Sequence, residues 1–374
     1  MKRNTLLYIG ICALFTLFLT SCDKGDKKKY DEMGDHGKTA RTENLQENLK
    51  TLHEQGVLFG QMYGTICGVG WENDSMRSDI HSVCGDFTAC TGYELSDLRS
   101  GTDNTEIPLA TIKADILHMA KRGGLSIIRW MMPEPSDEEE QETMVKAMAQ
   151  YLNSLEDDYG KKAPVVVYLL PRISEEWYTT LPAEEYQDLY NKVREELEDL
   201  EVVNAIWGYS FEDSELADQA MTFCPKDMVS IVDVTASPSV AQDQLSKGWQ
   251  HLNNRLQSLL PLIEQKKLAL GITVGDYQAK DSTYWSRTVL PVITSNRLCY
   301  ALFRENCGMG ADIVAACPYP GSSDIADFMK LVNDKRTLFS RKVNGLYLKC
   351  EQKACSCTEN PFITRISHSH LLKR

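Results

Sequence analysis

The chain of 374 residues has little positive charge and few long apolar runs. Its 40 Lys and Arg residues stand against 53 Asp and Glu, which gives a formal net charge of -13. A nucleic-acid partner requires a basic surface for its phosphates, so this balance argues against one. Apart from the run from Leu6 to Leu19, no segment is long and apolar enough to be expected to cross a membrane.

Standard zinc-binding spacings are also missing. Cys350, Cys355 and Cys357 precede two histidines near the C-terminus, but their spacing fits no standard zinc pattern, and the segment is polar. We therefore predict no metal site and no cofactor, and we expect residues 346–374 to form a disordered tail.

The twelve cysteines do not form the pattern of a small disulfide-rich domain, and the chain is too long to need one. Cys84 and Cys90 could pair in an oxidising compartment. Cys299 could likewise pair with Cys307 or Cys317. Buried free thiols remain an equally open interpretation of the same residues.

The N-terminus has the pattern of an export signal. A charged start is followed by a short apolar run, and Leu19-Thr20-Ser21-Cys22 resembles the bacterial lipobox. This resemblance implies a signal peptide over residues 1–21, lipidation of Cys22, and attachment to the cell envelope, with the outer membrane as the expected location. An uncleaved signal anchor is the alternative. The polar residues 22–44 are expected to form a flexible tether.

The body of the chain alternates between strand-like and helix-like patterns. The run Val165 to Leu170 is apolar and mostly β-branched, which is typical of a strand buried on both faces. Eight such strands, with helical patterns between most of them, predict an α/β fold, a (β/α)8 TIM barrel, with a doubly wound open sheet as the alternative. The other expected strands are 57–60, 89–95, 126–130, 202–210, 228–235, 268–275 and 299–304.

Two helices have clear sequence signals. After Pro182, apolar residues from Tyr186 to Leu200 recur on one face, and Pro182 suits a first helical turn. The acidic run Asp137-Glu138-Glu139-Glu140 is expected to be the exposed first turn of a helix, where negative charge is favourable.

Many short motifs, in order, resemble glycoside hydrolase family 26 over about residues 45 to 345. The family is mostly β-mannanases, so the resemblance implies a (β/α)8 barrel that cuts β-1,4-mannan with retention. It also implies an acid/base Glu at the end of the fourth strand and a nucleophile Glu at the end of the seventh. The motifs are Phe59-Gly60-Gln61, Gly68-Val69-Gly70-Trp71, Arg77-Ser78-Asp79, Val83-Cys84-Gly85-Asp86-Phe87, Tyr93-Glu94-Leu95, Arg122-Gly123-Gly124, Trp130, Leu290-Pro291, Pro318-Tyr319-Pro320-Gly321 and Asn333-Asp334-Lys335-Arg336-Thr337-Leu338-Phe339.

The chain departs from this family at the fourth strand, where the family has a His-Glu pair. No histidine occurs here between His118 and His251. Matching without a gap puts Arg172 at the acid position. A four-residue slip would instead put Glu176 there, but an insertion inside a barrel strand would disturb the ladder, so we favour the ungapped match.

Two further positions depart from the family. Thr273 stands at the nucleophile position of the seventh strand, and a hydroxyl cannot replace a carboxylate there without an activating base. Met131 follows Trp130 where the family has a histidine. We therefore predict that Arg172, Thr273 and Met131 are degenerate catalytic positions and that no catalytic pair is present, with Glu176 and Glu305 as the fallback carboxylates.

Groups suited to sugar binding are still present. Aromatic faces bind sugar C–H patches, while polar groups fix the orientation of the ring. The predicted partner is accordingly a β-linked polysaccharide or oligosaccharide. The predicted ligand-binding residues are Trp130, Tyr93, Arg172, Tyr209, Glu212 and Asp213.

Three functions are compatible with these residues. The first is a lipid-anchored glycan-binding protein on a degenerate hydrolase barrel, and it is the one that we predict. The second is an active retaining endo-β-1,4-mannanase that uses Glu176 and a displaced second carboxylate. The third is an interaction scaffold without a carbohydrate site, which would have a barrel mouth filled by apolar side chains.

Overall fold

The computed structural model describes residues 32–74, 77–173, 175–238, 245–275, 282–310 and 313–349. The predicted signal peptide, Cys22 and most of the predicted C-terminal tail lie outside these ranges. Within them, no helix combines the length and apolar character that a membrane span requires.

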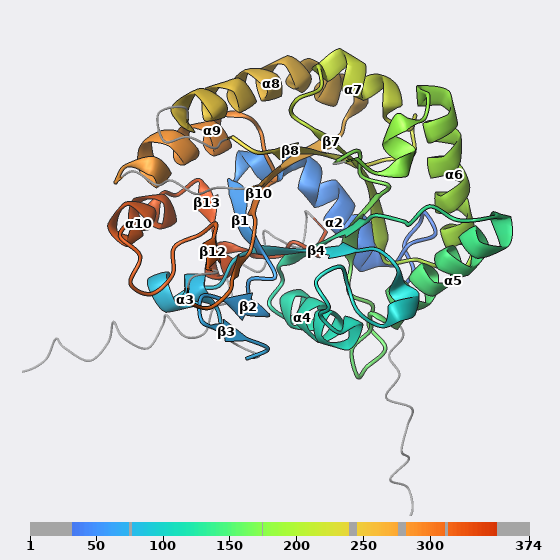
Figure 1. The fold of residues 1–374 in the computed structure, drawn as a ribbon, viewed down its shortest axis with the longest axis horizontal. Helices are drawn as coiled ribbons and strands as arrows, with labels where there is room; N and C mark the ends of the chain where they lie inside the picture. The colour runs from blue at the N-terminus through green and yellow to red at the C-terminus, as the bar shows by residue number, and fades with distance from the viewer. Residues whose placement is uncertain are drawn as a thin grey trace, which may run out of the picture.

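Eight parallel strands close into a barrel (Figure 1). Each strand pairs with the next along the chain, and the last pairs with the first through the register Gly60 to Leu302. The (β/α)8 prediction is confirmed, with the strand from Val165 fourth, and the open-sheet alternative is wrong. The barrel strands are β1 (Val57–Met62), β4 (Cys90–Leu95), β5 (Leu125–Trp130), β6 (Val165–Leu169), β7 (Ala205–Glu212), β8 (Ile231–Ala236), β9 (Ala269–Val274) and β10 (Tyr300–Phe303).

Helices surround the barrel (Figure 1). The longer ones are α4 (Leu109–Lys121), α5 (Glu138–Ser154), α6 (Ala183–Asp199), α8 (Leu245–Lys266) and α10 (Ile325–Asn333). Shorter ones are α3 (Asp79–Cys84), α7 (Ala217–Phe223) and α9 (Leu290–Ser295). Single turns are η1 (Leu52–Glu54), η2 (Leu98–Ser100), η3 (Trp177–Thr180), η6 (Ser340–Lys342) and the π-helical η4 (Tyr284–Val289).

The two helices with clear sequence signals form as predicted. Pro182 caps α6, and the stripe that it precedes is buried at Tyr186, Tyr190, Val193 and Leu197. Burial of this stripe against the barrel is what stabilises a helix whose other faces are polar. In α5, the side chain of the N-cap residue Asp137 accepts a hydrogen bond from the backbone of Glu140.

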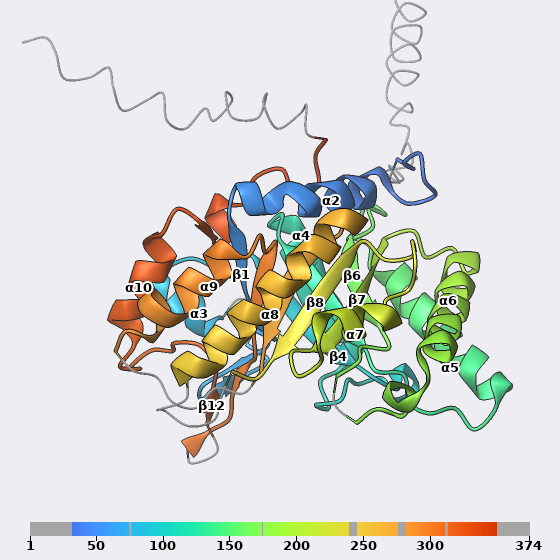
Figure 2. The same cartoon turned by 90° about the horizontal axis from the view of Figure 1, so that it is seen from above.

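The N-terminal end of the barrel is covered by α2 (Ala40–Thr51), seen in Figure 2 as the dark blue helix across the strands. The backbone N–H of Thr39 donates to the carbonyl of Val203, just before β7, at 3.0 Å. The folded part thus begins inside residues 22–44, predicted as tether. It also continues past 345, because Asn48 donates to the carbonyl of Leu346 at 2.8 Å.

One disulfide forms among the described residues, between Cys67 and Cys307. The pairings that we considered from the sequence do not form, because Cys84, Cys90 and Cys299 are free thiols. Sequence separation gives no guide to this pairing. The two partners, 240 residues apart in sequence, meet because they follow β1 and β10, which are neighbours in the closed barrel.

Short strands extend the barrel at its two ends. β13 (Thr337–Leu338) pairs with the start of β1. Two small antiparallel hairpins, β2 (Cys67–Gly68) with β3 (Trp71–Glu72) and β11 (Asn306–Cys307) with β12 (Val314–Ala315), follow the carboxyl ends of β1 and β10. The disulfide joins these two hairpins.

Candidate functional site

The carboxyl ends of the eight strands form the mouth of the barrel, on the side opposite to α2 (Figure 2). In (β/α)8 proteins this face carries the active site, because the loops that follow the strands meet there. Side chains that face the interior are identified by contacts between strands that are not neighbours in the sheet. Such contacts join Arg129 to Asp233, Tyr168 to Tyr300, and Tyr300 to Asp233.

A buried ion pair lies inside the barrel. Nη2 of Arg129 is 3.3 Å from Oδ2 of Asp233, and the two side chains are 1% and 0% exposed. The same guanidinium donates to Ser210 at 3.1 Å and approaches Glu94 at 3.5 Å through Nη1. A charge this deeply buried is tolerated only when it is paired and hydrogen-bonded, so Arg129 and Asp233 depend on each other.

Both oxygens of Asp233 are fully used within the protein. Oδ1 accepts hydrogen bonds from the hydroxyls of Tyr300 at 2.8 Å and Thr273 at 3.0 Å. Oδ2 accepts from Ser210 at 3.0 Å and from Thr235 at 3.3 Å, in addition to its ion pair. This carboxylate therefore has no free lone pair to offer to a ligand.

Two tyrosines fill the interior beside this carboxylate. The hydroxyls of Tyr168 and Tyr300 lie 2.7 Å apart across the barrel. Gly208 and Gly271 make room for their rings, because a Cβ atom at either glycine would clash with the neighbouring tyrosine. Burial, followed by the negative charge of Asp233, raises the pKa of both phenols well above its usual value, so both hydroxyls keep their protons.

Thr273, at the predicted nucleophile position, lies in the interior and is 1% exposed. Its hydroxyl donates to Asp233, and in the ladder it is level with Thr235 and Leu302. The acceptor of this hydrogen bond is the carboxylate of Asp233, whose two oxygens already accept several other hydrogen bonds. The hydroxyl is thus a structural donor in this arrangement.

Charged side chains line the rim above this interior. Arg304, directly after β10, donates to Glu94 Oε1 at 2.9 Å and to Glu305 Oε1 at 3.2 Å. The side chains of Glu94, Arg304 and Glu305 are 15%, 31% and 20% exposed, so solvent reaches them. The mouth is therefore polar and charged.

The side chain of Arg172 points away from the barrel interior. Its guanidinium lies 3.6 Å from the ring centroid of Phe223 and 5.5 Å from that of Tyr186, both on the outer helices. It also approaches Glu215 at 3.4 Å. This placement corrects the expectation that the guanidinium occupies the acid position in the mouth. The side chain is turned outward because the chain bends at Leu170, whose φ is +48°.

Trp130, Tyr93 and Tyr209, all predicted to bind ligand, are each 0% exposed and point outward. The phenol of Tyr93 donates to Asp115 on α4 at 2.7 Å, and that of Tyr209 donates to a backbone carbonyl of α7 at 2.8 Å. The indole of Trp130 donates to the carbonyl of Ser96 at 2.9 Å. In this conformation their polar atoms are satisfied within the protein, and a ligand at the mouth does not reach them.

Three other predicted residues lie at the carboxyl ends of their strands. Glu212 ends β7, is half-buried, and is two residues beyond the inward-facing Ser210. Asp213, the next residue, is half-buried, and this burial raises the pKa of its carboxyl although His251 lowers it. Met131 follows β5 and is 8% exposed.

Glu176 caps the η3 turn after β6 and is half-buried. Burial raises the pKa of its carboxyl above the usual value. Burial, followed by the charge of Glu176, raises the pKa of the phenol of Tyr178, which is 0% exposed and has no hydrogen-bond partner among the described residues.

No group of three or more His, Cys, Asp or Glu side chains among the described residues could hold a metal ion. The cysteines and histidines of the C-terminal tail begin at Cys350 and lie outside the described residues. The prediction of no metal site in that tail stays a prediction.

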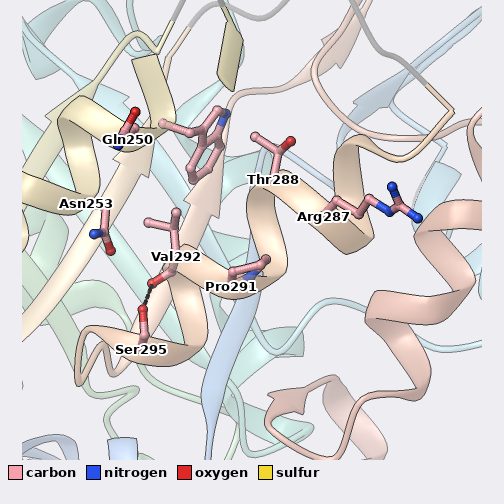
Figure 3. Close-up of a pocket in the computed structure, with 8 residues that line it drawn as sticks. Gln250, Asn253, Arg287, Thr288, Pro291, Val292 and Ser295 are labelled. Atoms are coloured by element: carbon pink, nitrogen blue, oxygen red, sulfur yellow. Dashed lines mark hydrogen bonds between the residues drawn. The ribbon is translucent and has the colours of Figure 1, made fainter. Parts of the chain in front are cut away.

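A pocket of about 360 Å³ lies in the helical layer, between α8 and the segment η4–α9 (Figure 3). One wall is the ring of Trp249, whose buried indole N–H has no hydrogen-bond partner within the part of the chain that the structure describes. Neither the charged rim nor the barrel interior contributes a residue to its lining, so the pocket is separate from the mouth. The residues labelled around it are Gln250, Asn253, Arg287, Thr288, Pro291, Val292 and Ser295.

No family model and no curated protein matches this chain. Solved structures do match it. A glycoside hydrolase family 26 β-mannanase from Bacteroides ovatus is 25% identical, with a TM-score of 0.76, over 83% of this chain and 98% of that one. A family 26 protein from Muricauda sp. is 18% identical, with a TM-score of 0.73, over 83% of this chain and 94% of that one.

A third similar structure is a modular endo-β-1,4-mannanase from Cellulomonas fimi, described as a family 26 mannanase. It is 20% identical, with a TM-score of 0.72, over 84% of this chain and 78% of that one. The structural neighbours of this chain are thus glycoside hydrolase family 26 proteins, β-mannanases among them, and the closed barrel of eight parallel strands that it shares with them is the fold that its motifs implied.

Proposed function

We propose that this protein binds β-linked, mannan-type glycans at the mouth of a hydrolase-type barrel and does not hydrolyse them. The observation that carries the proposal is the state of the seventh strand. Thr273, which the motif match assigns to the nucleophile position, donates its hydroxyl to Asp233, a carboxylate that is 0% exposed and paired with Arg129.

Retaining hydrolysis requires two carboxyl groups about 5–5.5 Å apart on either side of the bond that is cut. Asp233 does not suit the role of nucleophile, because its two oxygens accept hydrogen bonds from Tyr300, Thr273 and other hydroxyls. Attack on a sugar would require breaking this network and the ion pair with Arg129 together.

The acid position is compromised independently. The ungapped match assigns this position to Arg172 and not to a glutamate, and the side chain of Arg172 packs against Phe223 outside the barrel. A guanidinium also cannot donate a proton near neutral pH. Loss of both roles favours an inactive barrel over one with reduced activity.

Binding is favoured over a pure scaffold by the polarity of the mouth. Glu94, Arg304 and Glu305 form a partly exposed charged row, and Glu212 ends another strand of the barrel, β7. Such groups can exchange hydrogen bonds with sugar hydroxyls and fix their orientation. An interaction scaffold without a sugar site would have no need for them.

An active retaining endo-β-1,4-mannanase is a second candidate, and one observation favours it. Burial raises the pKa of Glu176, and a raised pKa is what a general acid requires. This enzyme would need a displaced second carboxylate such as Glu305. The side chain of Glu305 already forms an ion pair with Arg304 at 3.2 Å.

The test uses purified protein with β-mannan, glucomannan and other β-glycans, scored for new reducing ends and for binding by calorimetry. We expect binding of at least one mannan-type glycan and no reducing ends above a no-protein control. Hydrolysis that disappears in Glu176→Gln would establish the second candidate. Absence of both binding and hydrolysis would refute the first two functions.

We further propose that the protein is exported and that a lipid on Cys22 anchors it to the bacterial cell envelope. The outer membrane is the expected location. The disulfide between Cys67 and Cys307 supports an oxidising compartment. Replacing Cys22 by Ser should release the protein from the membrane fraction. Continued membrane association of that variant would contradict the proposed anchor.

A further inference from the structure

Another pocket lies at the amino end of the barrel, on the side of α2 and opposite to the mouth (Figure 2). It has a volume of about 340 Å³. Its walls are the end of α2, the turn η1 and the two turns that lead from α8 into β9 and from α9 into β10. We call it the basal pocket, and its charged lining residues are Lys50, Glu264, Lys267 and Arg297.

Two of these cations stand where the backbone disfavours a side chain. Lys267 has φ of +55°, and Arg297 has φ of +54°. The N–H of Lys267 donates to the carbonyl of Glu264 at 3.1 Å, and the N–H of the next residue donates to that of Ile263 at 3.0 Å. This is the C-cap turn at which glycine is usual, because other residues lose stability there. Strain of this kind concentrates at ligand sites.

The basal pocket is positive, although the chain as a whole carries a formal charge of -13. Three cations and one carboxylate line it. Arg297 is paired with Glu264, and Lys50 is paired at 2.7 Å with Glu47, which does not line the pocket. The ammonium of Lys267 has no partner among the described residues. Because charges in water are screened beyond about 10 Å, these local groups decide what the pocket attracts, and they favour an anion.

His53, which also lines the pocket, orients Arg297 without adding charge. Nε of Arg297 donates to Nε2 of His53 at 3.1 Å, so this ring nitrogen acts as an acceptor. Burial, followed by the charge of Arg297, lowers the pKa of His53, and the ring is neutral at pH 7. The guanidinium also donates to Glu264, and its remaining N–H groups are left for oxygen atoms of a ligand.

The floor of the basal pocket is apolar. Ile263 and Leu270 are buried, and Leu260 and Leu268 are half-buried beside them. An inorganic anion would leave this floor in contact with water. An amphiphile can instead place its anionic group against the cations and cover the leucines with its hydrocarbon part. A glycerophospholipid belongs to this class of ligand.

The basal pocket also lies on the side from which the chain leads to the proposed anchor. The backbone N–H of Ala40, the first residue of α2, donates to the carbonyl of Glu32 at 2.8 Å. Ten residues separate Cys22 from Glu32, a span of at most about 35 Å. A lipid on Cys22 would therefore keep the α2 side of the barrel near the bilayer.

We propose that the basal pocket binds the phosphate group of an anionic phospholipid, so that the amino end of the barrel rests on the membrane and the mouth points away from it. The three cations meet the phosphate oxygens, and Leu260 and Leu268 lie against the hydrocarbon of the lipid. This contact is separate from the proposed glycan binding. It adds to the proposed anchor on Cys22, which alone would hold the chain without fixing its orientation.

The test measures flotation of purified protein with vesicles of phosphatidylcholine, with and without phosphatidylglycerol, at low ionic strength. It uses the mature chain from residue 22 with Cys22→Ser, which carries no lipid. The variant Lys267→Gln/Arg297→Gln is compared with the matched control Lys146→Gln/Lys192→Gln. Both pairs remove two positive charges, and Lys146 and Lys192 are exposed on the outer helices α5 and α6.

The protein with an unchanged pocket, and the control, should float with vesicles that contain phosphatidylglycerol and not with phosphatidylcholine alone. The pocket variant should partition about thirtyfold less, because two basic residues near an anionic surface are lost. Lys267→Gly should partition about fivefold less and should melt at a higher temperature, because glycine removes the strain at this φ. If Lys267 served only to stabilise the fold, its removal would lower the melting temperature.

Equal flotation of the pocket variant and the control would overturn the inference, as would absence of flotation or flotation that does not depend on phosphatidylglycerol. If the pocket variant loses calorimetric binding of inorganic phosphate while its flotation is unchanged, the pocket holds a free anion and the lipid assignment is wrong. Mannan binding should be the same in every variant, because none of these residues lies at the mouth. Failure of the proposed glycan binding would therefore leave the flotation result unaffected.

Discussion

The ion pair between Arg129 and Asp233 offers the strongest test of the interior that we describe. Replacing Arg129 by Met keeps the volume of the side chain and removes its charge. Asp233 would then stay buried with hydroxyl donors only, among them Thr273 and Tyr300. Glu94 would lose a contact at 3.5 Å but keep its hydrogen bond with Arg304, so its share of the loss is small.

The size of the effect follows from the separation of 3.3 Å between the two charged groups. At an effective dielectric constant of about 20, their attraction is about 5 kcal/mol. Removing one partner of a buried pair typically lowers stability by about 3–5 kcal/mol. We therefore expect Arg129→Met to lower the free energy of unfolding by about that amount.

Urea unfolding at pH 7, followed by circular dichroism, measures this free energy. The double variant Arg129→Met/Asp233→Leu supplies the control, because it removes both charges and leaves none unpaired. We expect it to be clearly more stable than Arg129→Met alone. A loss below about 1 kcal/mol in the single variant, or a double variant as unstable as the single one, would refute the buried pair.

Three further predictions concern the site and two titrating groups. Thr273→Glu should yield no new reducing ends from mannan and should lower the melting temperature, because it puts a second carboxylate beside Asp233; restored turnover would contradict this. Glu176→Gln should be more stable than the wild type at neutral pH, and the difference should vanish below pH 4.5. Folding raises the pKa of Glu176, so the wild type loses stability as pH rises through that pKa. A difference in chemical unfolding that does not depend on pH would exclude this. Lys38→Met should be more stable than the wild type below pH 8, because burial lowers the pKa of Lys38 to about 8. In unfolding curves this gain in stability should shrink as pH rises toward 10.5, whereas a gain that grows with pH would show the sign to be wrong.

The eight strands could be predicted from the sequence because each is a short, mostly apolar segment that is largely buried. The run Val165–Leu169 is fully buried, as a strand between a barrel interior and a helical layer must be. Such strands show little alternation of polar and apolar residues, however, so their sequence does not indicate which side chains face the barrel interior.

That ambiguity explains why the aromatic candidates were misplaced. Tyr93, Trp130 and Tyr209 point outward, and in each case an adjacent polar residue faces the interior or the mouth, namely Glu94, Arg129 and Ser210. Successive side chains on a strand point to opposite faces, so an error of one residue assigns to the site a side chain that lies in the core between barrel and helices. A polar residue inside an apolar strand is the signal that could have identified the inward face.

The ends of the strands were harder to predict for a different reason. Arg172 lies two residues beyond Leu170, whose backbone adopts φ of +48°. Alternation applies only while the backbone remains extended, and the turn rotates the side chains of the residues after it. No local sequence pattern gives that rotation, so a motif match at Arg172 could assign the position but not the direction of its side chain.

The pairing of β1 with β10 also dictates the order in which the chain can fold. Leu58 pairs with Tyr300, so the first barrel strand must wait for the last before it gains its second neighbour. Until then, both strands keep a row of unpaired backbone groups, and such edges favour association between chains. Because so distant a pairing also requires a large loop to close, folding should be slow and completed only once nearly the whole chain is available. A chain cut off before Tyr300 should therefore aggregate rather than persist as a smaller soluble domain.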